Sequence, residues 1–232
     1  MGKKYFLIVV LLVLIFHESY SQVNIQPYVS YVRNLNPDYK ANTYGGGIRF
    51  EFGRSESTFS YYAGFGYNLA IKKTAELEAR AYSNFTSPET VPVTAKYSLP
   101  MYRLEGGSRF YFAGEQHNYE GFNFYANLGA EVIVTPNKPV YSDFDRSLYG
   151  LGFSTTRDVN EDGTEKVAIN LMLAGGLGIE KNVGMVNIFM QLGIAFPATR
   201  SGNSDISSSI ESFTPIPVNL NFGIKLPISS RE

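Results

Sequence analysis

The chain has 232 residues, with 20 Lys and Arg against 21 Asp and Glu, which gives a formal net charge of −1. No cluster of basic residues stands out, so nothing in the sequence indicates nucleic-acid binding. Cysteine is absent, which excludes both a disulfide framework and a lipid anchor attached through cysteine. The length fits one β domain, and no segment after the first twenty residues is apolar for long enough to predict a membrane-spanning helix.

The N-terminus has the pattern of a secretory signal peptide. Lys3 and Lys4 precede the apolar run Tyr5–Phe16, and Ser19-Tyr20-Ser21 offers the small residues that favour cleavage. An uncleaved anchor is the alternative, but the apolar run is shorter than the roughly 20 residues that a spanning helix needs. We therefore expect a cleaved signal peptide over 1–21 and a single mature domain over 22–232.

Eight segments of the mature chain alternate between apolar and polar residues, which is typical of β-strands. In chain order they are Val23–Val32, Tyr44–Gly53, Thr58–Ile71, Ser98–Phe112, Gly121–Val134, Val167–Lys181, Met185–Phe196 and Pro215–Leu226. In the second segment Ile48, Phe50 and Phe52 share one face, whereas Arg49 and Glu51 share the other. The third segment places Phe65, Leu69 and Ile71 on its apolar face.

Charged residues well inside these segments all fall on the same face. They are Arg49, Glu51, Arg103, Glu105, Arg109, Glu131, Glu180 and Lys225. An apolar outer face and a polar inner face predict an all-β fold, an eight-stranded antiparallel up-and-down transmembrane β-barrel with a polar lumen. The four positive and four negative groups balance, and an eight-stranded interior is just wide enough for side chains to fill. A salt-bridged plug is therefore favoured over a narrow or gated pore.

The connections between the segments alternate in length. Short ones follow the second, fourth and sixth segments, at 54–57, 113–120 and 182–184, and long ones lie at 33–43, 72–97, 135–166 and 197–214. Outer-membrane barrels have short periplasmic turns and long extracellular loops. This pattern predicts that the four long connections lie outside the cell.

One stretch conflicts with the simple alternation. Val91, Tyr97, Leu99 and Met101 have the same parity that carries Arg103 and the other charges further along the segment. Because proline within sheets occurs at bulges or edges, we expect a bulge or phase break near Pro100. The stretch before it should project beyond the membrane.

Candidate sites for chemistry are few. Asp158, Asn160 and Asp162, followed by Gly163, match the start of a calcium-binding loop, but the twelfth position is Ile169 rather than glutamate. A solvated turn is the simpler interpretation, and calcium in the third long loop is the alternative. We expect no other cofactor.

The mature chain has a single histidine, His117, and it falls in a short connection on the predicted periplasmic side. A serine–histidine nucleophile on the outer side is therefore unavailable. The predicted lumen glutamates have Arg and Lys neighbours that would neutralise them. We expect no enzymatic activity.

The chain resembles the small outer-membrane β-barrel domains of Gram-negative bacteria, the OmpA/OmpX-like and PorT-like group. The likeness rests on Ser21-Gln22 at the signal end, on SLPMYRLEGGSRFYF (Ser98–Phe112) and on LMLAGGLGIEK (Leu171–Lys181). The resemblance implies an eight-stranded barrel in the outer membrane. The end of the chain departs from the group, because it runs past Phe222 to Glu232 instead of finishing on an aromatic residue.

These observations predict a structural or surface-interaction protein of the outer membrane whose long loops contact an unidentified extracellular partner. Its other expected partners are outer-membrane lipid and lipopolysaccharide. Two alternatives stay open within the membrane class, a narrow channel for ions or small solutes and a secretion-accessory barrel. From another class, the alternative is a soluble periplasmic barrel that binds a lipid or small apolar ligand with its apolar face turned inward.

Overall fold

The computed structural model describes residues 22–35, 40–53, 57–112, 121–137, 140–151, 166–201 and 215–230. The elements within these ranges are all β-strands: β1 (Gln22–Asn34), β2 (Ala41–Gly53), β3 (Phe59–Ala81), β4 (Thr90–Tyr111), β5 (Phe122–Asn137), β6 (Val140–Tyr141), β7 (Tyr149–Gly150), β8 (Lys166–Val183), β9 (Val186–Ser201) and β10 (Pro217–Ser230). Within the same ranges, no helix has the length and apolar character needed to cross a membrane.

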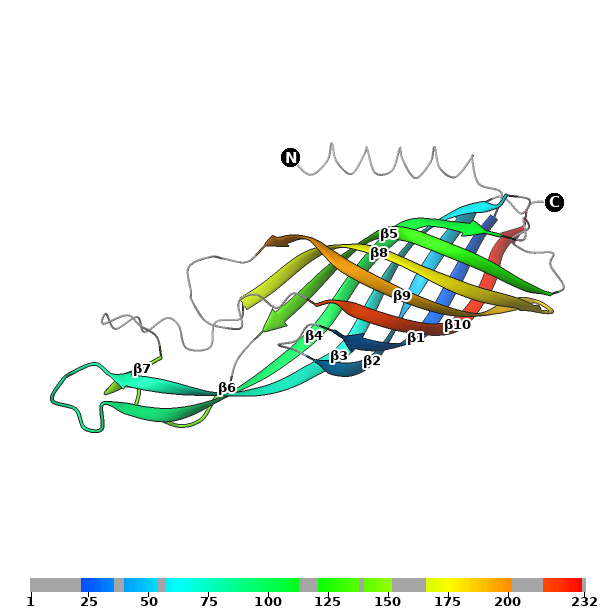
Figure 1. Cartoon of the computed structure of the whole chain (residues 1–232). Helices are drawn as coiled ribbons and strands as arrows, with labels where there is room; N and C mark the ends of the chain where they lie inside the picture. The colour runs from blue at the N-terminus through cyan, green and yellow to red at the C-terminus, as the bar shows by residue number, and fades with distance from the viewer. Residues whose placement is uncertain are drawn as a thin grey trace, which may run out of the picture.

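The eight long strands form a closed antiparallel barrel (Figure 1). Each long strand pairs with its neighbours in sequence, and β10 returns to pair with β1, so that Gln22 lies opposite both Gly53 and Ser230. The turn between β8 and β9 lies at this same end of the barrel, and Gly184 adopts a left-handed φ of 76° there. The predicted eight-stranded up-and-down fold is confirmed.

The two faces of the barrel wall differ as the alternation predicts. The outer surface is made of exposed apolar side chains, including Ile48, Phe65, Leu104, Leu128, Leu173, Leu192 and Phe222. Arg49 and Glu51, which alternate with outward residues of β2, are buried inside. Such an outer surface suits lipid and not water. The soluble barrel with an inward apolar face is therefore inconsistent with the structure.

Aromatic rings gather at both ends of this apolar surface. Phe110 contacts Phe59 across the strand pair at 5.3 Å between ring centroids and Phe112 at 5.5 Å, near the end that carries the β8–β9 turn. Toward the opposite end, tyrosines of adjacent strands pair: Tyr31 with Tyr44 at 5.3 Å, and Tyr67 with Tyr102 at 5.1 Å. Girdles of aromatic side chains at both boundaries are typical of transmembrane barrels, and the tyrosine rings add a polar tip that favours the interface.

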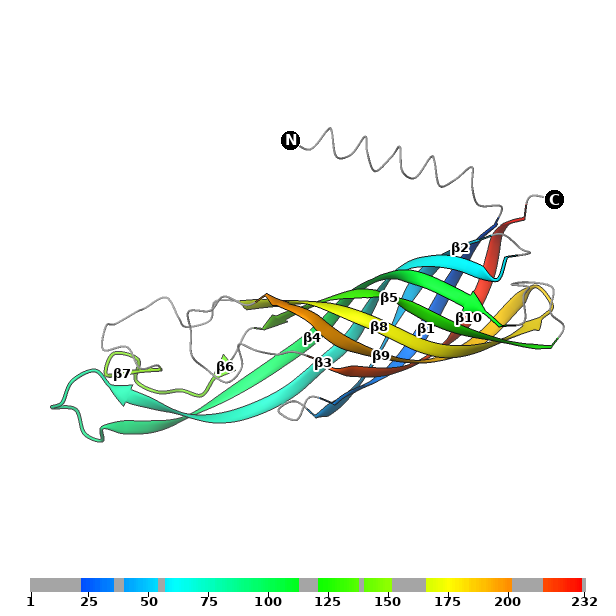
Figure 2. The ribbon, with the colours of Figure 1, turned by 45° about the horizontal axis from the view of Figure 1, so that its top comes forward.

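The strands β3 and β4 extend far beyond the other strands (Figure 2). Their pairing continues past the barrel as far as Arg80 opposite Thr90. We call this two-stranded extension, residues 72–98, the arm. The long connection predicted over 72–97 is therefore mostly paired strand. Strands also run into the other three predicted loops, to Asn34, Asn137 and Ser201.

The predicted irregularity near Pro100 is present, but it lies on the facing strand. Asn68 pairs with Met101 and Ile71 pairs with Leu99, so two residues of β3, Leu69 and Ala70, oppose Pro100 alone. This bulge reverses the inward parity of β3, whereas β4 keeps one parity throughout. Ile71, predicted to face outward, is consequently buried at 5% exposure.

Because β4 keeps its parity, its apolar residues continue into the barrel. Val32, Ile71, Leu99, Met101, Ile133, Met172 and Ala195 form a buried cluster, which we call the apolar layer. The layer lies across the end of the lumen nearest the arm, beyond the charged residues of the same strands. The apolar layer therefore interrupts the predicted polar lumen, and buried polar residues such as Asn34 and Thr135 continue beyond it.

We expect Leu99→Ala to lower the free energy of unfolding by about 2–4 kcal/mol, because it leaves a cavity in a packed layer. Leu104→Ala on the same strand is the matched control. Leu104 is 56% exposed, so the alkyl chains of the detergent can fill the space left by its side chain. Urea titration in detergent micelles measures the free energy of unfolding of both variants. Far-UV circular dichroism follows the unfolding, because the chain has no tryptophan. Equal losses for the two variants would contradict a packed layer at Leu99.

Candidate functional site

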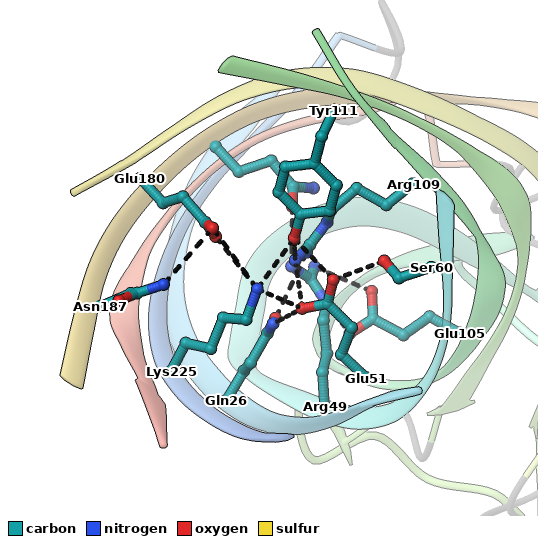
Figure 3. Close-up of polar contacts among 11 residues, drawn as sticks. Gln26, Arg49, Glu51, Ser60, Glu105, Arg109, Tyr111, Glu180, Asn187 and Lys225 are labelled. Atoms are coloured by element: carbon teal, nitrogen blue, oxygen red, sulfur yellow. Dashed lines mark hydrogen bonds and ion pairs between the residues drawn. The ribbon is translucent and has the colours of Figure 1, made fainter. Parts of the chain in front are cut away.

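All eight charged residues predicted for the lumen lie inside the barrel. Their exposure ranges from 0% for Glu51 to 7% for Glu105. The structure brings them together into ion pairs that connect strands on different sides of the wall (Figure 3). We call this set of side chains and the polar groups bound to them the lumen network.

Glu51 of β2 is the most heavily coordinated carboxylate in the network. Arg109 of β4 approaches it to 2.8 Å and Lys225 of β10 to 3.2 Å. The Tyr111 hydroxyl donates a hydrogen bond of 2.6 Å to Oε1, and Ser60 and Gln26 also donate to this carboxylate. Two cations and three neutral donors thus surround one buried charge, which offsets its loss of hydration.

Glu105 of β4 forms the second centre. Arg49 donates from Nε to Oε1 at 2.7 Å and from Nη2 to Oε2 at 2.9 Å, which is the bidentate geometry that suits a guanidinium. The Tyr28 hydroxyl of β1 donates to Oε1 at 2.8 Å. Arg49 also donates to Gln191 of β9 at 2.9 Å and lies over the Tyr28 ring at 4.5 Å. One ion pair therefore connects four strands.

The remaining pairs are looser. Arg103 and Glu131 approach to 3.7 Å, and Lys225 lies 3.4 Å from Glu180 as well as close to Glu51. Asn187 is 3.5 Å from Glu180 and supplements its single cation. The network is therefore tightest around Glu51 and Glu105 and weaker toward Glu131 and Glu180.

Tyrosine rings fill the interior between these charges. The Tyr125 ring lies 4.2 Å from the Arg109 guanidinium and packs against Tyr111 at 5.5 Å between centroids. It extends over the neighbouring strand at Gly178, where a Cβ atom would come within 2.1 Å of the ring. Glycine at this inward position is thus required by the close approach of Tyr125. Tyrosine rings thus pack around the charged groups of the lumen network, in addition to the ion pairs between those groups.

This arrangement offers little for catalysis. Each lumen carboxylate has a cation within 4 Å, so none is a free general base. Among the described residues, no group of three or more His, Cys, Asp or Glu side chains is placed to hold a metal ion. The predicted calcium ligands Asp158, Asn160 and Asp162 lie outside the described residues, as does His117. The geometry favours a structural role for the charges.

The arm carries a second packed unit that the sequence did not reveal. Residues 140–151, which we call the strap, cross from one edge of the arm to the other, because β6 pairs with β4 at Ala95 and Lys96 and β7 pairs with β3 at Arg80 and Ala81. A small apolar cluster is enclosed between strap and arm. Its members are Ala79, Val93 and Tyr149, with Ala81, Val91, Tyr141, Phe144 and Leu151 packed against them.

Hydrogen bonds fix the strap in place. The Tyr82 N–H donates to the Leu148 carbonyl at 2.9 Å, and the Tyr149 hydroxyl donates to the Pro88 carbonyl at 3.0 Å. Within the strap, Ser147 donates from its hydroxyl and its backbone N–H to Asp145, which lowers the pKa of that carboxyl. Tyr141, Phe144 and Tyr149 of the strap pack in the small apolar cluster against the arm.

Comparisons with known proteins give similarity in structure only. No family model matches the chain, and no curated protein matches its sequence. Among solved structures, Neisserial surface protein A (NspA) is similar at 9% identity, covering 88% of this chain and 96% of that chain with a TM-score of 0.49. Ail, the attachment invasion locus protein of Yersinia pestis, solved with the heparin analogue sucrose octasulfate, is similar at 12% identity, 89% and 97% coverage and a TM-score of 0.42. The fold that the family resemblance implies, an eight-stranded barrel, is confirmed by the strand pairing.

We expect Glu105→Gln to destabilise the barrel by about 3–5 kcal/mol, because it leaves the buried Arg49 without its carboxylate while preserving size. Glu89→Gln is the matched control: Glu89 pairs with Arg80 at 3.0 Å, but the two side chains are 76% and 65% exposed. An exposed pair contributes less than about 1 kcal/mol. The measurement is the urea midpoint in detergent, and an unchanged midpoint for Glu105→Gln would refute a structural network.

Proposed function

We propose that this protein is a non-enzymatic outer-membrane barrel that displays a rigid arm on the cell surface for contact with an extracellular partner. Export would use the predicted N-terminal signal peptide. The end of the barrel with the β8–β9 turn would face the periplasm, and the arm would face outward. The lumen network would then serve to hold the barrel closed and in register.

The observation that carries this proposal is the strap packed on the arm. An isolated two-stranded hairpin is only marginally stable in water. Here the hairpin gains an apolar cluster around Val93 and Tyr149 and edge pairing from β6 and β7. A separate core outside the barrel adds nothing to the closure of the barrel itself. It supports a surface structure whose shape is fixed before any partner arrives, which lowers the entropy cost of binding.

The tip of the arm has the composition of a contact surface. Residues 82–88 read YSNFTSP and contain no charge. Phe85 is 99% exposed, while its N–H donates to the Ser83 hydroxyl and the Thr86 N–H donates to the Ser83 carbonyl. An ordered turn thus presents one aromatic ring among small hydroxyl and amide side chains, the mixture typical of protein-binding loops.

The filled interior favours this role over transport. The apolar layer and the lumen network lie one above the other, and Met101, Ile133 and Met172 of the layer are each at most 1% exposed. An ion would have to cross an unhydrated layer and then displace paired charges. This arrangement supports a plug and gives no support to the channel alternative.

Cysteine labelling on intact cells tests the surface display. The chain has no cysteine, so Phe85→Cys at the tip and Met185→Cys in the β8–β9 turn each create a single thiol. Both positions are open, since Met185 is 91% exposed. A membrane-impermeant maleimide should label Phe85→Cys on intact cells and Met185→Cys only after the outer membrane is permeabilised. The opposite labelling pattern would show that the arm faces the periplasm. If neither thiol were labelled in permeabilised cells, the two side chains would not be exposed as described.

Conductance in planar bilayers tests the plug. We expect the reconstituted wild-type protein to produce no stepwise current, because the apolar layer excludes water from the outer end of the lumen. Insertion is verified separately by the shift in gel mobility between unheated and boiled samples. Regular conductance steps from inserted protein would overturn the plug and restore the channel.

A further inference from the structure

The far end of the strap lies against the tip of the arm. β7 pairs with β3 at Arg80 and Ala81, immediately before residues 82–88, which we call the tip turn (Figure 1). Strap residues 145–150, which we call the strap end, therefore lie beside the tip turn, although 61 positions separate Pro88 from Tyr149 in the sequence. The surface around the tip is thus built from two segments of the chain.

The strap end binds the tip turn at both of its ends. On the β3 side, the Tyr82 N–H donates to the Leu148 carbonyl at 2.9 Å. On the β4 side, the Tyr149 hydroxyl donates to the Pro88 carbonyl at 3.0 Å. Proline has no N–H, so this carbonyl is the only hydrogen-bonding group on the Pro88 backbone. Two neighbouring residues of the strap thus hold the turn where it leaves each strand of the arm.

The hydrogen bonds within the tip turn lie nearer its middle. The Thr86 N–H donates to the Ser83 carbonyl at 3.0 Å, and the Phe85 N–H donates to the Ser83 hydroxyl at 3.2 Å. Below the turn, the Ala81 N–H donates to the Glu89 carbonyl at 2.9 Å and closes the hairpin. The internal bonds shape the turn, whereas the bonds from the strap end hold it in one direction relative to the arm.

The strap end is itself an ordered turn around Asp145. The Asp145 carboxylate accepts hydrogen bonds from the hydroxyl and the N–H of Ser147, and its carbonyl accepts one from the Tyr149 N–H at 2.9 Å. Aspartate often stabilises turns in this way, through its own side chain. The Tyr149 ring is buried in the small apolar cluster beside Val93. Both ends of Tyr149, backbone and ring, are therefore fixed before its hydroxyl reaches the tip turn.

The strap end and the tip turn also meet through their side chains. A Cβ atom at Gly150 would come within 2.6 Å of the Tyr82 hydroxyl and 2.8 Å of its ring, so the ring lies across this glycine. Tyr82 is 37% exposed and Leu148 is 44% exposed. The exposed apolar surface that begins at Phe85 therefore continues onto the strap.

We propose that Tyr149 is a positioning residue for the contact surface at the tip, and that the strap end forms the second half of this surface. The inference rests on the proposed surface display and identifies what directs Phe85 toward a partner. A turn held at both ends populates mainly one orientation. If the turn opened more often, its affinity for a partner would fall in proportion to the fraction that is correctly placed.

Hydrogen exchange of single amides, followed by NMR of the protein in detergent micelles, tests this role. Tyr149→Phe removes the hydroxyl and keeps the ring in the cluster. Tyr141→Phe is the matched control, because Tyr141 packs against the same cluster but pairs with Ala95, farther from the tip. The reporter is the Thr86 amide, whose hydrogen bond lies wholly within the tip turn. Its exchange rate reports how often the turn opens.

We expect the Thr86 amide to exchange about fivefold faster in Tyr149→Phe, which corresponds to the loss of one ordinary hydrogen bond. In Tyr141→Phe its exchange rate should match that of the parent. The paired amides of β3 and β4 farther down the arm should keep their parent rates in both variants, because the strand pairing is unaltered.

Asp145→Ala gives a second disturbance that acts from outside the tip turn. It removes the acceptor of both Ser147 hydrogen bonds, so the strap end should hold Tyr149 less firmly and Thr86 exchange should rise again. Asp145→Asn keeps an acceptor oxygen at the same place and should restore slow exchange.

Unchanged Thr86 exchange in Tyr149→Phe or in Asp145→Ala would overturn the proposal, as would an equal acceleration in Tyr141→Phe. Acceleration spread evenly over the arm would assign Tyr149 to the stability of the arm and would also reject a positioning role. Labelling of Phe85→Cys on intact cells depends on the orientation of the barrel and not on these hydrogen bonds. Surface display and positioning therefore fail separately.

Discussion

The closed barrel depends on the way that Glu51 and Glu105 bind cations from distant strands. Backbone hydrogen bonds connect only adjacent strands, whereas the side chains in the lumen connect strands that lie farther apart. Glu51 of β2 reaches Arg109 on β4 and Lys225 on β10, and Glu105 reaches Arg49, which in turn contacts Gln191 on β9. These contacts connect opposite parts of the wall. Because an unpaired buried charge is costly, a register that separated these pairs would destabilise the barrel.

The interior combines this network with an apolar layer of a different character. The outer face is apolar and the lumen carries the charges, so the ordinary arrangement of an apolar core and a polar surface is reversed for most of the barrel. At the arm end it changes back, because Leu99, Met101 and Met172 turn inward. The same strand β4 therefore passes from a part with charged inward residues to a part with apolar inward residues. The strap continues that second arrangement with its own small core.

Most of the fold was predictable because strands with one apolar and one polar face impose strict alternation. The parity of Arg49, Glu105 and Lys225 was enough to place them inside, and the balance of charges indicated pairing. Their individual partners were not predictable, because Arg49 with Glu105 depends on strand tilt and on distances across the lumen. The alternation from Val91 to Met101 was visible but was assigned to the wrong cause. A sequence pattern shows parity along one strand and cannot show that the bulge lies on the other.

The strap could not be predicted from the sequence, for a different reason. Its two strands, β6 and β7, are two residues each, too short for any periodicity to appear. Only its aromatic residues, such as Phe144 and Tyr149, hinted at packing, and the surface against which they pack exists only once β3 and β4 extend as an arm. Local sequence therefore could not distinguish a free loop from a docked one.

The bulge at Leu69 and Ala70 has a consequence for how this surface can change during evolution. Residues inserted into an exposed turn are usually tolerated, because the flanking strands keep their faces. Loss of Leu69 or Ala70 would remove the bulge and leave Ile71 inward opposite Leu99. Loss of one residue farther along, between Ile71 and Leu77, would instead rotate the rest of β3 by half a repeat, sending Leu77 and Ala79 to the solvent and turning Glu78 inward. Beyond the bulge, length variation along this strand should therefore come in pairs of residues. The tip around Phe85 is free to diversify in composition and length, while the base of the arm keeps its count.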